Sequence, residues 1–135
     1  MSLATVQTRA KLGIQAPSVS VEAHLSNGLP SFQIVGLPET AVKESKDRVR
    51  SAIINSHFEF PARRITINLA PAELPKEGSR FDLAIAIGIL AASNQLPSEL
   101  LDQYEFIGEL ALSAELRPVE AVLPSALSCA ASGKQ

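Results

Sequence analysis

Residues 60–93 read FPARRITINLAPAELPKEGSRFDLAIAIGILAAS, and this stretch decides the kind of fold that the chain adopts. Its first part, Arg64 to Leu69, alternates polar and apolar residues, which predicts a strand with one buried face. Its last part, from Leu83 to about Ser93, is apolar almost all round, which predicts a central, buried helix. Asp82 stands directly before that helix and is expected to be its N-cap. The prolines between the two elements predict an extended loop.

Strands and helices are also predicted on both sides of this stretch. Residues 18–25 alternate cleanly between polar and apolar side chains, which is typical of a half-buried strand. The further predicted strands are 5–12, 32–35 and 104–111, with an edge or turn at 117–119, and the further predicted helices are 40–55 and one that starts at Pro124 and is capped by Gly133. This order predicts an α/β fold, a layered α+β sandwich with a mixed sheet.

Composition limits the class of protein. The chain has 135 residues, 46% of them apolar, which suits one domain with a sizeable core and excludes global disorder. A lone Cys129 excludes a disulfide framework and a metal site built from several cysteines. The N-terminus lacks the pattern of a signal peptide, and the longest apolar run, residues 83–92, is too short to span a bilayer. We therefore expect a soluble, cytoplasmic protein without a membrane partner.

The net charge of −2 conceals an uneven distribution of charge along the chain. Residues 1–80 hold ten Lys and Arg against seven Asp and Glu, whereas residues 81–135 hold two against seven. Four cations flank or follow the predicted strand: Arg63, Arg64, Lys76 and Arg80. If these residues share one end of the sheet, they form a basic cluster that binds DNA weakly and in a salt-dependent way. The alternative is a solvated surface whose charges are unrelated.

Few other residues indicate a catalytic, metal-binding or cofactor-binding function. No phosphate-binding G-x-x-x-x-G-K-[ST] motif occurs, and His24 and His57 have no companion at metal-ligand spacing, so no metal site and no cofactor are predicted. Cys129 is expected to be a buried spacer. Ser79 lies close to Lys76 in the proline-rich loop, which suggests either a Ser–Lys nucleophile or a rigid connector without catalytic function.

Several motifs together resemble one family. They are Gly36-Leu37-Pro38, VKESKDRVRSAI at residues 42–53, the stretch 60–93, and GELALSAELRPV at residues 108–119. In these motifs the chain is similar to the N-terminal domain of the magnesium-chelatase-like AAA+ ATPases of the ComM/YifB family, which is linked to bacterial competence. The resemblance covers nearly the whole chain. It implies that residues 1–135 are a single ChlI-type domain that precedes an ATPase module.

The same motifs resemble, more distantly, the Lon-type peptidase domain, which carries its serine in P-K-D-G-P-S-A-G and its lysine after a G-E strand. Pro75-Lys76-Glu77-Gly78 matches the first of these motifs, but Arg80 stands at the position of the serine and Leu123 at that of the lysine. Both dyad positions are therefore degenerate. The resemblance implies a Lon-like fold, related to that of some ribosomal-protein domains, without its catalytic groups.

The function that the resemblance implies is that of a non-catalytic module in an ATPase that processes DNA, by branch migration or translocation, during natural transformation. The module would serve ring assembly, DNA contact or both. Its partners would be DNA, its own AAA+ module and like subunits in a ring, a hexamer in the parent protein, with ATP and Mg²⁺ bound by the parent's ATPase module. Two alternatives remain at this point: a Lon-type serine peptidase with residual activity, and a domain of a metal-chelatase subunit.

Overall fold

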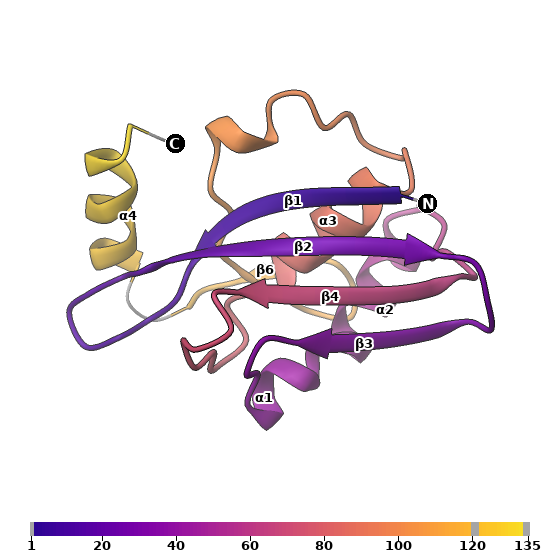
Figure 1. Cartoon of the computed structure of the whole chain (residues 1–135), viewed down its shortest axis with the longest axis horizontal. Coiled ribbons are helices and arrows are strands. Elements are labelled where there is room, and N and C mark those ends of the chain that lie inside the picture. Colours follow the sequence, from indigo (N-terminus) through magenta and orange to yellow (C-terminus); the bar gives the residue numbers. More distant parts are fainter. Residues whose placement is uncertain (1, 120–121, 134–135) are drawn as a thin grey trace.

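The computed structural model describes residues 2–119 and 122–133. Its main sheet has four strands in the order β1-β2-β4-β3, which are β1 (Ser2–Arg9), β2 (Ser18–Ser26), β4 (Arg64–Ala70) and β3 (Ser31–Val35) (Figure 1). β2 pairs antiparallel with both β1 and β4, and β3 pairs parallel with β4. The sheet is therefore mixed, and the predicted α/β fold is confirmed.

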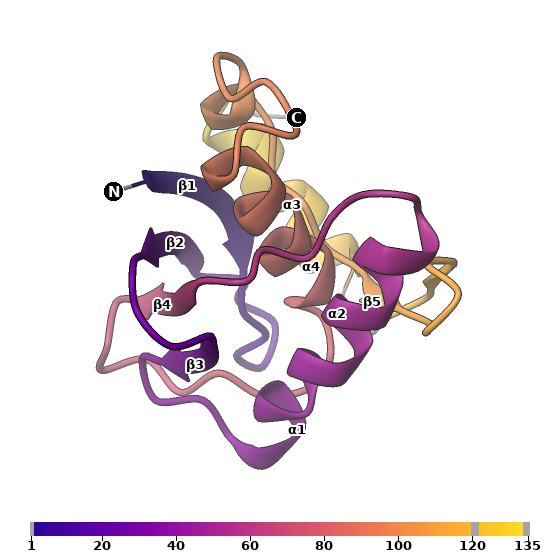
Figure 2. The ribbon, with the colours of Figure 1, turned by 90° about the vertical axis from the view of Figure 1, so that its right-hand side faces the viewer.

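The alternation of residues in β2 and β4 separates the two faces of this sheet. In the paired register, Ala23 lies opposite Ile67, and both are fully buried. Their neighbours Glu22 and Asn68 point to the other face, where the Asn68 amide donates to Glu22 Oε1 over 2.7 Å. The described helices gather on the buried side and at one end of the sheet, and none covers the polar face (Figure 2). The core therefore lies between the sheet and the helices.

The described residues form four α-helices beside the sheet: α1 (Thr40–Lys43), α2 (Ser45–Asn55), α3 (Asp82–Ala92) and α4 (Val122–Ala131). The predicted helix 40–55 is interrupted only at Glu44, and α1 and α2 together form the connection between the parallel strands β3 and β4. α3 packs on β1 and β2, as its apolar sequence predicts. Gly88 allows this close packing, because a Cβ added there would lie 3.1 Å from the Cβ of Ala23.

The C-terminal part departs from the prediction. Of the predicted strand 104–111, only β5 (Glu109–Leu110) forms, paired with β6 (Leu116–Arg117), and a short 3-10 helix η1 (Leu101–Gln103) precedes it. The reason is that Gly108 bonds to the start of α3: its N–H donates to the carbonyl of Arg80, just before the helix, and its carbonyl accepts from the N–H of Leu83, in the first turn of the helix, both over 3.1 Å. A Cβ at Gly108 would lie 3.0 Å from a methyl carbon of Leu116. This backbone is therefore not available for a longer strand.

The ends of the last helix agree more closely with the sequence. α4 begins at Val122, two residues earlier than the predicted start at Pro124. After the helix, Gly133 has a positive φ of 79°, the left-handed conformation that commonly ends helices, so the predicted cap is confirmed. Among the described helices, none is long and apolar enough to cross a membrane.

Candidate functional site

The loop between β4 and α3 is fixed by Lys76. Its side chain is fully buried, and the ammonium donates to the carbonyl oxygens of Gly36, over 2.6 Å, and of Pro71. Its backbone pairs with the segment after β3: Lys76 N–H donates to the Leu37 carbonyl, and Glu39 N–H donates to the Lys76 carbonyl. Burial lowers the pKa of the Lys76 amine. Lys76 thus links two of the motifs that carry the family resemblance: the stretch 60–93, to which it belongs, and Gly36-Leu37-Pro38.

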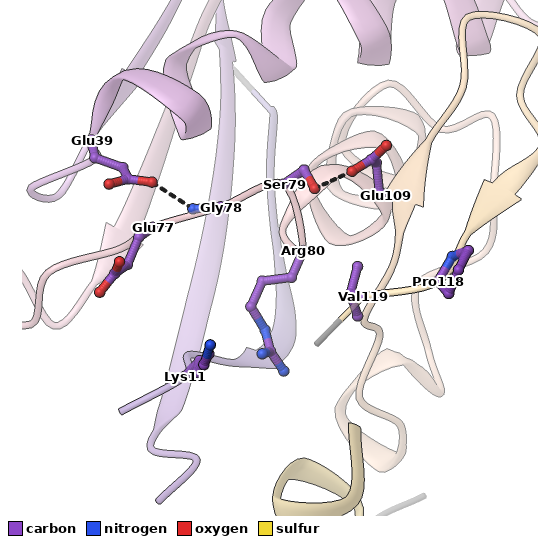
Figure 3. Close-up of a pocket in the computed structure, with 9 residues that line it drawn as sticks. All are labelled: Lys11, Glu39, Glu77, Gly78, Ser79, Arg80, Glu109, Pro118 and Val119. Carbon is purple, nitrogen blue, oxygen red and sulfur yellow. Dashed lines mark hydrogen bonds between the residues drawn. The ribbon is translucent and has the colours of Figure 1, made fainter. Parts of the chain in front are cut away.

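The residues that follow Lys76 line a hollow, which we call the Ser79 hollow (Figure 3). The Ser79 hydroxyl donates to Glu109 Oε1 on β5, and the Gly78 N–H donates to Glu39 Oε1 over 2.7 Å. The hollow has a volume of ≈ 410 Å³, within the range of small-molecule sites. Its lining comprises Lys11, Glu39, Glu77, Gly78, Ser79, Arg80, Glu109, Pro118 and Val119. Carboxylates, cations and one hydroxyl therefore meet here.

Arg80 occupies the inner wall of the Ser79 hollow. Only 4% of its surface is exposed, and its guanidinium Nη2 donates to the Ser125 hydroxyl of α4 over 2.6 Å. Burial lowers the pKa of this guanidinium. The other degenerate dyad position, Leu123, lies in the first turn of α4, and its side chain is outside the described part of the structure. Arg80 therefore connects the loop to α4.

The prediction that Asp82 caps α3 is wrong. Phe81 holds the N-cap position, and no side-chain capping hydrogen bond forms there. The Asp82 carboxylate instead turns toward α2 and β5: it accepts from the Ser45 hydroxyl (2.6 Å), from Arg48 Nε (2.7 Å) and Nη2 (3.1 Å), and from the Leu110 N–H (3.0 Å). Asp82 is fully buried, so its charge is compensated by these donors and by the guanidinium. Asp82 thus forms a buried ion pair with Arg48 of α2.

The four predicted DNA-binding cations do not form one cluster. Arg63 and Arg64 precede and begin β4, whereas Lys76 and Arg80 follow its end at Ala70. A strand of this length separates the two pairs by roughly 20 Å. Lys76 and Arg80 are also buried and bonded to acceptors within the protein, whereas Arg64 is exposed. The convergence that the sequence suggested is therefore wrong, and only the first pair is accessible.

Three residues that matter here were missed by the reasoning from sequence, namely Ser45, Arg48 and Glu109. All three stand in the motifs that carry the family resemblance, but only the fold brings them beside Asp82 and Ser79. Of the other candidates, His24 lies on the half-buried polar face of β2, His57 is exposed after α2, and Cys129 is half-buried in α4. In residues 2–119 and 122–133, no group of three His, Cys, Asp or Glu side chains is placed to hold a metal ion.

The residues that most nearly resemble a phosphate-binding loop do not fit ATP. Pro75-Lys76-Glu77-Gly78-Ser79 lacks the glycine pattern of such a loop. The ammonium of Lys76, which would have to reach the phosphates, is buried against two backbone carbonyls. The loop is therefore built as a connector and not as a nucleotide cradle.

Comparison with known proteins places the sequence among relatives. The family model described as subunit ChlI of Mg-chelatase matches residues 21–135. The chain is 60% identical over 135 residues to the competence protein ComM of Haemophilus influenzae and to YifB of Escherichia coli. These matches cover the whole of the chain, but only 26% of ComM and 27% of YifB. A protein of Mycobacterium tuberculosis is 41% identical over 133 residues, 98% of the chain and 26% of that protein. The chain thus spans about a quarter of the length of these relatives.

Proposed function

The chain belongs to the magnesium-chelatase-like family of ComM and YifB, and on that basis we propose that it is a non-catalytic module of an AAA+ ATPase that processes DNA during natural transformation. The module contacts DNA and contributes to the assembly of the ATPase ring in the cytoplasm. The parent protein translocates on DNA or migrates branched intermediates. ATP and Mg²⁺ are assigned to the ATPase module of that parent, because the loop in this chain does not fit a nucleotide.

The observation that carries the non-catalytic role is the use of Arg80. In the Lon-type pattern its position belongs to the nucleophilic serine, whereas here a buried guanidinium holds α4 through Ser125. An arginine side chain presents only donors and has no nucleophilic atom at neutral pH. The position that holds a nucleophile in the Lon-type pattern thus supplies a structural contact in this chain.

The Ser79 hydroxyl and the Lys76 amine of the loop are also hydrogen-bonded to other groups and not to each other. A Ser–Lys dyad requires the amine at the hydroxyl, within about 2.6–3.2 Å. Ser79 donates to Glu109, and the Lys76 ammonium donates to two backbone carbonyls and does not line the Ser79 hollow. These bonds favour a scaffold over the peptidase alternative.

Two observations support the DNA-contacting role. One relative is named a competence protein, and competence is the capacity of bacteria to take up DNA. Ten of the twelve cations precede Phe81, and the exposed members of this set include Arg50 and Arg64. Clustered cations bind phosphates by releasing counterions, so the affinity falls as salt rises.

The test of this role is a DNA titration. We expect the chain to bind fluorescently labelled single-stranded and branched DNA weakly at about 50 mM salt, and clearly less well at about 200 mM. A small basic surface predicts this result because few phosphates are contacted. The absence of binding at the lower salt, or equal binding at both, would contradict the DNA-contacting role.

A further inference from the structure

A second hollow lies at the other end of β4, where the strand begins. Its volume is ≈ 310 Å³, and we call it the Phe60 hollow. It is formed by the start of β3, the middle of α2 and the connection that leads into β4, and its lining comprises Pro30, Ser31, Phe32, Arg50, Phe60, Pro61, Ala62 and Arg63. No carboxylate is among these residues. The hollow thus combines aromatic rings with positive charge.

The rings and a guanidinium form a stacking surface. The ring centroids of Phe32 and Phe60 are 5.7 Å apart, with an angle of 35° between the ring planes. The guanidinium carbon of Arg50 lies 5.0 Å from the centroid of Phe60, which is cation–π geometry. Both phenylalanines are half-buried and line the hollow, and the Arg50 guanidinium lies over the ring of Phe60, so a ligand in the hollow meets the remaining ring surface and this guanidinium. A flat, electron-rich ring is the group that such a surface accepts.

Two guanidinium groups, those of Arg50 and Arg63, line the Phe60 hollow, and that of Arg64 lies outside the lining, beside Gly28. Arg50, Arg63 and Arg64 form no ion pair in the described part of the chain. Arg63 makes one long hydrogen bond, of 3.5 Å, to the Leu25 carbonyl. Residues 23–38 and 60–72, which supply most of this end of the sheet, contain no Asp or Glu. Of the acidic residues close in sequence to the lining, Glu59 directly precedes Phe60 and Asp47 stands three residues before Arg50, and both are exposed. The three guanidinium groups are therefore available to an anion.

From this geometry we infer that the Phe60 hollow binds single-stranded nucleic acid, with one base stacked in the hollow and the flanking phosphates on Arg50, Arg63 and Arg64. The inference rests on the proposed DNA-contacting role and assigns the DNA contact to the Phe60 hollow. A duplex does not fit the aromatic surface, because the faces of its bases are already stacked on one another. Single strands expose these faces, and proteins bind them with aromatic side chains in basic grooves. Three phosphate contacts also suit weak binding by one isolated domain.

The inference is tested by titrating a fluorescein-labelled oligothymidylate with the chain and its variants. For three phosphate contacts, the affinity of the parent is expected to fall about 20-fold between about 50 mM and about 200 mM salt. The variant Arg50→Gln, Arg63→Gln keeps one contact, and its affinity is expected to fall only about 3-fold over the same range. The matched control is Arg117→Gln, which removes one charge from a side chain that is 61% exposed beside Glu109. Its salt dependence is expected to equal that of the parent.

A second variant tests the stacking. Phe60→Leu keeps an apolar side chain in the partly buried position but removes the aromatic face. It is expected to weaken binding by about 5-fold or more at about 50 mM salt, since the stacking of a base on an aromatic ring contributes about 1–3 kcal/mol. Circular dichroism and urea unfolding show whether the variant keeps the parent fold. Weaker binding by a folded variant supports the inference.

The outcomes separate this inference from the proposed function. If the parent binds and both variants bind as it does, the Phe60 hollow is not the site, although the DNA-contacting role stands. If thymidine monophosphate competes as well as the oligonucleotide at equal nucleotide concentration, the hollow takes a free nucleotide and the inference of a strand is wrong. If the parent does not bind at low salt, both the inference and the DNA-contacting role are overturned.

Discussion

Replacing Asp82 with alanine is expected to lower the free energy of unfolding by about 3–5 kcal/mol. The substitution leaves the Ser45 hydroxyl buried and without its acceptor, and it removes the carboxylate that pairs with Arg48. It also removes the acceptor of the Leu110 N–H. Because α2, α3 and β5 meet at this one carboxylate, the loss weakens three contacts at once.

Urea unfolding of this variant measures the effect, and Asp47→Ala is its matched control. Asp47 is an exposed carboxylate on α2, so its removal is expected to change stability by less than about 0.5 kcal/mol. A helix cap contributes only about 0.5–2 kcal/mol. A loss within that range for Asp82→Ala would therefore contradict the role of Asp82 as a buried link between elements.

Replacing Gly36 with alanine is expected to cost at least about 3 kcal/mol or to abolish cooperative unfolding. Gly36 has a φ of 105°, and a Cβ at this position would lie 2.2 Å from the carbonyl oxygen of Leu69 and 2.8 Å from its nitrogen. The backbone of β4 cannot yield without disturbing the sheet. The Gly36 carbonyl also accepts from Lys76, so a shift here would disturb the buried ammonium.

Gly13→Ala separates this clash from the strain of a left-handed backbone. Gly13 also has a positive φ, of 61°, but nothing lies within 4 Å of an added Cβ. Gly13→Ala is expected to lower the free energy of unfolding by only about 1–2 kcal/mol. Thermal and urea unfolding of both variants give the comparison, and equal losses would show that the contact with Leu69 is unimportant.

The sequence predicted the individual strands and helices better than it predicted which of them pack against one another. The alternation in residues 18–25 and 64–69 identified the two central strands, and the apolar run from Leu83 identified α3, because these patterns reflect burial against a single core. The strand order was not predicted, since pairing depends on contacts between distant segments. The length of the strand that contains β5 was overestimated, because Gly108 bonds to Arg80 and Leu83 at the start of α3.

For the candidate site, the sequence identified the right loop but assigned wrong roles to two features. Asp82 stands where an N-cap is common, yet its partners Ser45 and Arg48 come from α2, far away in the sequence. The separation of Arg63 from Arg80 could have been predicted, because residues before and after one strand lie at its opposite ends. The Phe60 hollow could be identified only from the three-dimensional structure, since Phe32, Arg50 and Phe60 come from three segments.

The central claim of the proposed function is that the loop between β4 and α3, whose sequence resembles a peptidase motif, serves as a scaffold, and intact-mass measurement after treatment with a serine-directed phosphonate tests it most directly. We expect no adduct on the unmodified chain, because the Ser79 hydroxyl is bonded to Glu109 and the Lys76 ammonium donates to two backbone carbonyls. We also expect none on Arg80→Ser, Leu123→Lys, because Phe81 and Asp82 stand where the peptidase pattern has small residues and Asp82 keeps its partners on α2. Labelling of the double variant alone, at its introduced serine, would keep the scaffold claim and correct the role given to these two residues. Stoichiometric labelling of the unmodified chain at Ser79 would contradict the claim.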